Sequence, residues 1–197
     1  RPCSSGSAGG SIERAGMHTA DKIIAVSYLT KNIIISRYGI TGDKVEVVYN
    51  GVERNGNGLN FGKIDIKKDE KIVLFLGRIT MQKGPEYFLG AAKKVLEVMD
   101  DVKFVMVGSG DMMRRTVELA AELGIGSKVL FTGFLRGEDV RRVYEMADLY
   151  VMPSVSEPFG IAPLEALNHD VPVLISKQSG VSEVLTHVLK ADFWDIN

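Results

Sequence analysis

The stretch ADLYVMPSVSEPFGIAPLEAL, residues 147–167, decides the fold. A short apolar run at 149–152 has the composition of a buried strand, and Pro158 and Gly160 mark the loop that follows it. Pro163 then suits the first turn of a helix. A strand that leads through a loop into a helix is the repeating unit of a parallel sheet covered by helices. The stretch therefore predicts an α/β protein.

The same alternation of strand and helix patterns runs along the chain. Apolar residues spaced three and four apart predict core-facing helices at residues 85–99, 111–124 and 137–147, and Gly124 suits a left-handed helix stop. Short β-prone runs predict strands at residues 22–26, 45–49, 72–76, 104–107, 128–131, 149–152 and 173–175. We therefore expect a doubly wound, Rossmann-like parallel sheet with helices on both faces.

Length and composition limit the number of domains. The 197 residues, 45% of them hydrophobic, suffice for one complete core, or for one core and part of a second. The Gly- and Ser-rich residues 1–11 indicate a loop or linker. The polar residues 50–70 separate the first two predicted strands from the other five and indicate a surface excursion.

Charge and cysteine content exclude several classes of protein. A net charge of −1 gives no general attraction for nucleic acid or an anionic membrane, because both need clustered Lys and Arg. Cys3 is the single cysteine, so no disulfide can form within the chain, which favours a reducing compartment. No apolar run approaches the roughly 18 residues of a membrane span, and the N-terminal residues lack the apolar core of a signal peptide. We therefore expect a cytoplasmic protein.

Two cations flank the turn that follows the predicted strand at 72–76. Arg78 stands next to Gly77, and Lys83 comes directly before the predicted helix. The carboxyl ends of parallel strands form the ligand-binding edge of a doubly wound sheet, and a helix start offers free N–H groups to an anion. The planar Arg fork and the mobile Lys charge together suit a diphosphate. The alternative, two solvated surface cations, stays open.

Two further turns at this edge contain glycine. Gly108 and Gly110 allow the backbone to approach a phosphate, but Met113 stands where a dinucleotide fingerprint needs a third glycine. A plain tight turn is therefore the simpler interpretation. Phe134 follows Gly133, so a flat base could lie against exposed main chain there, although a core phenylalanine fits equally well.

Glu157 and Glu165 stand eight residues apart in the opening stretch. The loop carries Glu157, and Glu165 falls in the first helical turn. Carboxylates accept hydrogen bonds from vicinal hydroxyls, so one acid could hold a ribose and the other a hexose. The main-chain N–H groups of Phe159, Gly160 and Ile161 would lie between them. Alternatively, Glu165 complements the helix dipole and Glu157 faces water.

Taken together, these motifs resemble the C-terminal, donor-binding half of retaining GT-B glycosyltransferases, the glycosyltransferase group 1 or family 4 enzymes. The resemblance covers the chain from about residue 45 onward, in the family's order and spacing. It is carried by VVYNGVE (47–53), LFLGRITMQKG (74–84), VMVGSGD (105–111), VLFTGFL (129–135), the opening stretch and VPVLIS (171–176). Ser179 departs from the pattern, since relatives carry a glycine there, and residues 168–170 replace another glycine before the last predicted strand.

The resemblance implies transfer of a hexose from a nucleotide-diphospho sugar, such as a UDP-, GDP- or ADP-hexose, with retention at the anomeric carbon. Arg78, Lys83 and Glu157 would be the catalytic residues, the two cations gripping the diphosphate, so that neither metal nor cofactor is needed. The implied donor-binding set is Gly77, Arg78, Lys83, Gly108, Phe134 and Leu135 beside the base, Glu157 with the main chain of Phe159, Gly160 and Ile161 around the sugar, and Glu165 on the ribose.

By the same resemblance, residues 1–44 are a remnant of the N-terminal acceptor domain and linker. Residues 45–197 are the donor-binding domain with its C-terminal helix truncated. The acceptor, a sugar, lipid or polysaccharide, would bind through the missing domain, and peripheral membrane association of the full protein is compatible with this. His18 lies in the remnant and is not assigned to catalysis, while His169 and His187 are expected at helix ends or surfaces. We expect the fragment alone to be inactive and expect no nucleic-acid partner.

Three other functions are compatible with parts of the pattern. A catalytically silent nucleotide-sugar-binding or interaction module would use the same fold without transfer. Glycoside hydrolysis needs two carboxyl groups about 5–9.5 Å apart across a scissile bond, and it leaves Arg78 and Lys83 unexplained. An NAD-linked oxidoreductase is disfavoured by Met113. The base, the hexose and the acceptor are not specified by these residues.

Overall fold

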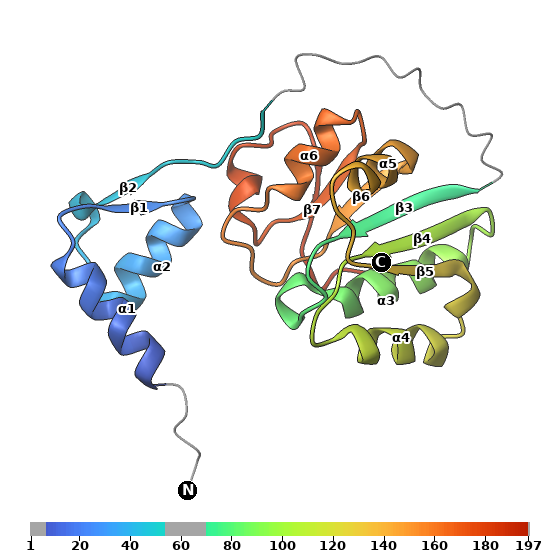
Figure 1. Cartoon of the computed structure of the whole chain (residues 1–197), viewed down its shortest axis with the longest axis horizontal. Helices are drawn as coiled ribbons and strands as arrows, with labels where there is room; N and C mark the ends of the chain where they lie inside the picture. The colour runs from blue at the N-terminus through green and yellow to red at the C-terminus, as the bar shows by residue number, and fades with distance from the viewer. Residues whose placement is uncertain (1–6, 54–69, 197) are drawn as a thin grey trace, which may run out of the picture. The chain divides into compact units, whose positions relative to one another are not determined.

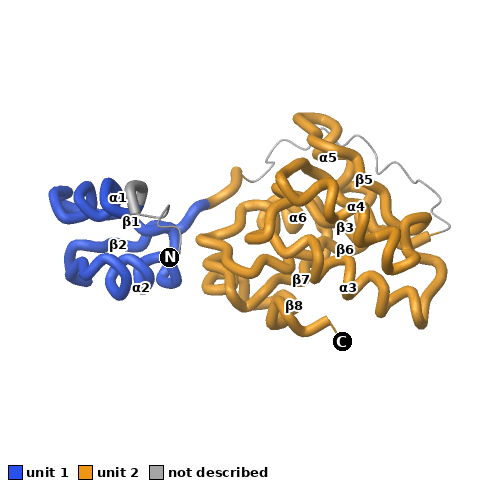
Figure 2. Tube along the Cα trace, turned by 90° about the horizontal axis from the view of Figure 1, so that it is seen from below, with its two compact units in different colours: residues 1–50 blue, residues 51–197 orange. Residues whose placement is uncertain are grey.

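The computed structural model describes residues 7–53 and 70–196 (Figure 1). The chain divides into two compact units, residues 1–50 and residues 51–197 (Figure 2). Each unit has its own sheet and its own core. In the described residues, no helix is both long enough and apolar enough to span a membrane.

The first unit is a small α/β arrangement. It contains α1 (Ser7–Thr19), β1 (Ile23–Ala25), α2 (Tyr28–Tyr38), the short helix η1 (Gly42–Lys44) and β2 (Val45–Val47). Strands β1 and β2 pair in parallel. Ser27 caps α2 by accepting a hydrogen bond from the amide of Thr30 over 3.0 Å, and Gly39 ends it with φ 70°. The core consists of Ala25, Ile34, Ile40 and Val45.

Two predictions about this part of the chain need correction. The boundary between the units follows Asn50 instead of residue 44, because Val45–Val47 pairs with Ile23–Ala25 and buries Val45 in the first unit. Residues 1–11 were expected to form a loop, but α1 begins at Ser7. Met17 packs on the core of the unit, and Glu13 accepts a hydrogen bond from Tyr38 over 2.8 Å. These two contacts anchor α1, although its sequence contains several glycines.

The second unit contains a six-stranded parallel sheet, so the predicted doubly wound fold is confirmed. Its strands lie in the order β5-β4-β3-β6-β7-β8. Their bounds are β3 Lys71–Leu76, β4 Val102–Val107, β5 Val129–Gly133, β6 Leu149–Met152, β7 Val173–Ser176 and β8 Leu189–Ala191. The sequence did not predict β8, because this edge strand is short and leaves Leu189 exposed. The order reverses between β3 and β6, which makes their carboxyl ends the switch point where doubly wound proteins bind ligands.

Helices cover both faces of this sheet (Figure 1). One face carries α3 (Pro85–Leu96) and α4 (Met113–Glu122), and the other carries α5 (Glu138–Met146) and α6 (Ala162–Asn168). Phe88 of α3 packs between Phe75 of β3 and Phe104 of β4, with ring centroids 5.5 and 5.8 Å apart. Short helices complete the unit: η2 (Met81–Lys83), η3 (Gly126–Lys128) and η4 (Gly180–Glu183). The rigid core therefore fixes the loops that follow β3 and β6.

Candidate functional site

The loops after β3 and β6 touch each other at the switch point. The amide of Val155 donates to the carbonyl of Gln82 over 2.9 Å. Gly84 has φ 68°, and a Cβ at this position would lie 2.1 Å from the carbonyl oxygen of Pro153. Only glycine fits both the left-handed backbone and this approach. The two loops therefore hold each other in place by main-chain contacts.

An ion pair crosses between the same two loops. Lys83 ends η2, and its Nζ atom contacts Oε2 of Glu157. The Lys83 side chain is 21% exposed and that of Glu157 is 9% exposed, so most of the pair is shielded from water. A partly buried pair of this kind leaves an uncompensated charge when one partner is removed. The structure thus joins two residues that the sequence analysis assigned to different parts of a ligand.

Arg78 lies on the loop after β3, the same loop that carries Lys83. Its side chain is exposed, and within residues 7–53 and 70–196 it makes no ion pair or hydrogen bond. The preceding Gly77 donates its amide to the carbonyl of Val107 over 3.0 Å, which holds the loop against β4. Arg78 therefore offers a guanidinium at the carboxyl edge of the sheet.

The glycines of the turn after β4 pack against the loop after β3. Gly108 has φ 134°, and a Cβ there would lie 1.9 Å from the carbonyl oxygen of Gly77. A Cβ on Gly110 would lie 2.2 Å from the carbonyl oxygen of Ile79. Contact between two main chains accounts for both glycines, in agreement with the tight-turn interpretation. A contact between Gly108 and a ligand stays a prediction.

Phe134 and Leu135 follow the end of β5, one strand further along the sheet. The side chain of Phe134 is 64% exposed, so a core role for it is wrong. The guanidinium carbon of Arg136 lies 5.1 Å from the centroid of its ring. Leu135 is half-buried. The carbonyl of Gly133 accepts a hydrogen bond from Gly108 over 2.8 Å, which links this turn to the one after β4.

The segment from Glu157 to Ile161 is held by main-chain hydrogen bonds from the start of η4. The carbonyl oxygens of Glu157 and Phe159 accept hydrogen bonds from Gly180 and Val181 over 2.9 and 2.7 Å. Gly160 has φ 99°, a conformation that favours glycine. The Phe159 side chain is buried, so only its main chain can face a ligand. In the described part of the chain, no acceptor reaches the amides of Gly160 or Ile161.

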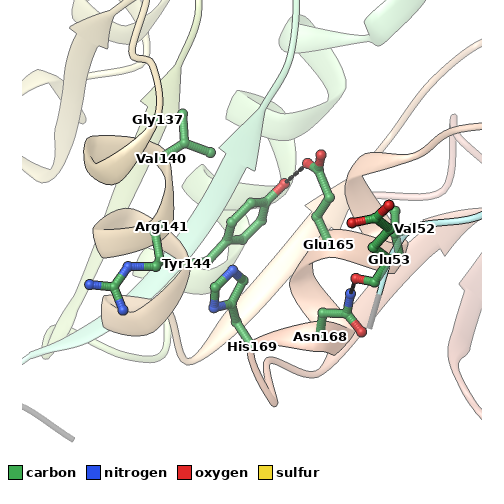
Figure 3. A pocket seen from close by; sticks show the side chains of 9 residues that line it. All are labelled: Val52, Glu53, Gly137, Val140, Arg141, Tyr144, Glu165, Asn168 and His169. Atoms are coloured by element: carbon green, nitrogen blue, oxygen red, sulfur yellow. Dashed lines mark hydrogen bonds between the residues drawn. The ribbon is translucent and has the colours of Figure 1, made fainter. Parts of the chain in front are cut away.

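Glu165 lines a pocket of about 350 Å³ between α5 and α6 (Figure 3). The hydroxyl of Tyr144 donates to its Oε2 atom over 2.9 Å. The ring of Tyr144 stacks on His169 with centroids 5.4 Å apart and an interplanar angle of 11°. The pocket is lined by Val52, Glu53, Gly137, Val140, Arg141, Tyr144, Glu165, Asn168 and His169. The carboxylate is therefore held by a side chain as well as placed near a helix start.

Burial raises the pKa of the Tyr144 and Tyr150 hydroxyls far above its ordinary value. For Tyr150, the charges of Glu157 and Glu165 raise the pKa further. The hydroxyl of Tyr150 donates to the carbonyl of Leu76 at the end of β3 over 3.2 Å. Both tyrosines stay protonated donors at neutral pH.

The predicted residues thus follow the carboxyl ends of neighbouring strands, although Arg78, Lys83 and Glu157 do not line the pocket of Glu165. Lys83 and Glu157 are in contact, Arg78 lies on the same loop as Lys83, and Glu165 is on the helix that follows the loop of Glu157. The sequence analysis missed Tyr144, Arg141 and Asn168. His169 lies at the C-terminal end of α6, as expected, and also lines this pocket. Tyr144 has the spacing of a core residue, and its partner is 21 residues away, so no local signal marks it. Among the described residues, no group of three or more His, Cys, Asp or Glu side chains is arranged to hold a metal ion.

Comparison with known families gives two adjoining matches. Residues 58–190 match the family described as glycosyl transferases group 1. Residues 6–55 match glycosyltransferase family 4. The junction between the two matches falls close to the boundary between the two compact units.

Similar proteins include an uncharacterized glycosyltransferase of Methanocaldococcus jannaschii, 37% identical over 89% of this chain and 47% of that protein. A D-inositol 3-phosphate glycosyltransferase of Nocardia farcinica is 33% identical over 83% of this chain and 39% of that protein. The chain thus spans less than half the length of these relatives.

Two solved structures share the fold. Sucrose-phosphate synthase of Thermosynechococcus elongatus has a TM-score of 0.78 at 24% identity, covering 95% of this chain and 49% of that one. Anabaena HepE in complex with UDP and glucose has a TM-score of 0.76 at 20% identity, covering 93% of this chain and 55% of that one.

Proposed function

The chain belongs to the group 1 glycosyl transferases, and from this we propose that it is the donor-binding half of a retaining enzyme that moves a hexose from a nucleotide-diphospho sugar to an acceptor. The observation that carries the proposal is the Lys83–Glu157 pair at the switch point, with Arg78 on the same loop as Lys83. A cation and a carboxylate in contact suit a ligand that has a diphosphate at one end and hydroxyl groups at the other.

In the proposed reaction, Arg78 and Lys83 stabilise the leaving nucleoside diphosphate. The bond between the anomeric carbon and the diphosphate breaks, and negative charge develops on the departing oxygen. A cation that is already held in place stabilises this charge without needing to reorganise. Lys83 is restrained by Glu157, so its charge is already in place. Each charge-assisted contact contributes about 1.5–3 kcal/mol.

The sugar and the nucleoside would contact the remaining residues of the set. Glu157 and the amides of Gly160 and Ile161 would bind sugar hydroxyls, and the fixed main chain of this loop supports such a role. Glu165 would accept from the ribose hydroxyls. Phe134, with Arg136 over its ring, would contact the base near Gly108 and Leu135. Because Anabaena HepE is in complex with UDP and glucose, UDP is the first nucleotide to test.

Isothermal titration calorimetry of this chain with UDP, GDP and ADP tests the binding part of the proposal. We expect at least one nucleotide to bind, and the variant Arg78→Ala with Lys83→Ala to bind it at least about tenfold more weakly. The matched control is Arg114→Ala with Lys190→Ala, which removes one Arg and one Lys from surfaces outside the site. Failure of all three nucleotides to bind, or equal loss in both double variants, would contradict the proposal.

The catalytic part concerns the whole protein, of which residues 1–50 would form a piece of the acceptor-binding domain. A silent binding module would bind the nucleotide sugar but never release its sugar to an acceptor or to water. Nuclear magnetic resonance of the product made from an α-linked donor would test retention, since an inverted product excludes it. The chain tested alone should bind its donor without transferring the sugar.

A further inference from the structure

The hydroxyl of Tyr144 bridges α5 and α6. It lies 2.9 Å from Oε2 of Glu165 (Figure 3). It also lies 3.3 Å from the carbonyl oxygen of Ala162, one turn earlier on α6. We propose that Tyr144 is a positioning residue, which orients the carboxylate of Glu165 toward the ribose hydroxyls of the donor. This inference rests on the proposed function, because it assigns Glu165 to the ribose.

The ring of Tyr144 is held rigidly. The residue is 1% exposed, its ring is stacked on His169, and on the sheet side it is tilted by 55° against Tyr150 at a centroid distance of 6.2 Å. A phenol ring packed by two aromatic neighbours has little freedom to turn. Its hydroxyl is therefore a fixed point, whereas a glutamate side chain without a partner loses appreciable rotamer entropy when a ligand orders it.

The hydrogen bond leaves part of the Glu165 carboxylate available. An ionised carboxylate can accept about four hydrogen bonds, and Tyr144 occupies one site on Oε2. Within residues 7–53 and 70–196, no donor reaches Oε1. The half-buried Glu165 lines the pocket and can offer this oxygen to hydroxyl groups of a ligand. Burial raises the pKa of Tyr144 and keeps it protonated at neutral pH. Its hydroxyl therefore donates to Glu165 and does not compete with Glu165 for the proton of a ribose hydroxyl.

A purely structural role would give a different result. If the hydroxyl only ties α5 to α6, its removal weakens the fold and affects every ligand equally. If it orients Glu165, its removal affects ligands that carry ribose hydroxyls and spares those that lack them. The difference between two nucleotides, rather than affinity alone, therefore separates the two roles.

The experiment compares UDP with 2′,3′-dideoxyuridine diphosphate, or the corresponding GDP or ADP pair if calorimetry shows that another base binds. We expect Tyr144→Phe to weaken UDP binding about three- to tenfold, the effect of one hydrogen bond, and to change binding of the dideoxy nucleotide less than about twofold. Glu165→Gln should show the same selectivity. Because the two residues act through one contact, the double variant should lose no more than Glu165→Gln alone.

Tyr150→Phe is the matched control, because it also removes a buried hydroxyl that donates to an oxygen, but that hydroxyl donates to the carbonyl of Leu76 and makes no hydrogen bond to Glu165. This variant should have the same ratio of UDP affinity to dideoxy nucleotide affinity as the unchanged chain. If Tyr144→Phe does not fold by circular dichroism, His169→Leu removes the stacking partner and should show a smaller loss with the same selectivity.

Several outcomes would overturn the inference. The first is that Tyr144→Phe weakens the binding of both nucleotides equally. The second is that Tyr150→Phe lowers the ratio of UDP affinity to dideoxy nucleotide affinity. The third is that the losses in the double variant are additive. In these cases Glu165→Gln still discriminates between the nucleotides, so the proposed function stands. Absence of nucleotide binding by the unchanged chain, or a Glu165→Gln variant without selectivity, would instead overturn the proposed function and this inference with it.

Discussion

Lys83 and Glu157 are 74 residues apart in the sequence, yet their side chains form a partly buried ion pair that joins the loops after β3 and β6. Chain connectivity alone does not bring these loops together. The parallel pairing of β3 with β6 places their carboxyl ends side by side, and the hydrogen bond from Val155 to Gln82 aligns the loops. The Lys83–Glu157 pair therefore stabilises the second unit and is also part of its candidate site.

Removing one partner of this pair should destabilise the second unit. Lys83→Met keeps most of the side-chain volume but leaves Glu157 without a counter-charge, which we expect to cost about 3 kcal/mol, the low end of the effect for a buried pair. Lys83→Met with Glu157→Gln should cost less than the sum of the single changes. Urea unfolding monitored by tryptophan fluorescence measures these free energies. Strict additivity would mean that the two side chains do not interact in solution.

Gly84 and Gly124 form a natural pair for testing the contact between the loops. Both have left-handed backbones, with φ 68° and 71°, but a Cβ at position 84 meets the carbonyl of Pro153, whereas one at position 124 meets no atom within 4 Å. Gly124→Ala should cost about 1–2 kcal/mol from backbone strain alone. Gly84→Ala should cost roughly 1–3 kcal/mol more, because the loop after β6 must move. Equal losses of unfolding free energy would show that the loops are not in contact.

The fold could be predicted from the sequence because its signals are local. The apolar runs at 72–76 and 149–152 and the helical stripe around Phe88 each carry their own periodicity, and they appear in the structure close to the predicted bounds. The run at 45–49 also forms a strand, but its composition does not show which sheet it joins. That choice depends on pairing with Ile23–Ala25, a contact over about 20 residues that no local pattern contains.

The candidate site was predictable in its location but not in its internal contacts. Strand order places Arg78, Lys83, Glu157 and Glu165 along one edge, as expected for a doubly wound sheet. The interactions between side chains were missed because they join different loops and helices. Lys83 meets Glu157, and Glu165 meets Tyr144, which has the spacing of an ordinary core residue.

Acid should weaken the network at the amino-terminal ends of β3, β4 and β5. Lys128 and Lys103 both pair with Glu70, at 2.9 and 3.0 Å, and they lower its pKa below the ordinary value of 4.5. A carboxyl group with a lowered pKa in the folded state stabilises the fold above its unfolded pKa, and this contribution is lost as pH falls through the folded value.

Unfolding measured from neutral pH down to below the folded pKa should therefore show a smaller acid-side loss for Glu70→Gln than for the unchanged chain. Lys128→Met removes the largest cause of the shift and should reproduce most of this change. Stability profiles that run parallel for all three proteins at acid pH would exclude the network as a source of pH dependence.

Phe134 should affect nucleotide binding without affecting stability. Its ring is 64% exposed at the carboxyl edge of the sheet, so Phe134→Ala removes little buried surface and should change the free energy of unfolding by less than about 0.5 kcal/mol. If a base stacks on the ring, the same change should weaken nucleoside diphosphate binding by about 1–3 kcal/mol.

Leu130→Ala, which truncates an exposed apolar side chain on β5, is the matched control and should leave affinity unchanged. Calorimetry with the nucleoside diphosphate and with inorganic pyrophosphate separates the contributions: Phe134→Ala should weaken only the nucleotide, because pyrophosphate has no base. If Phe134→Ala weakens the binding of both ligands, the base does not stack on Phe134, and the ring instead lies near the diphosphate.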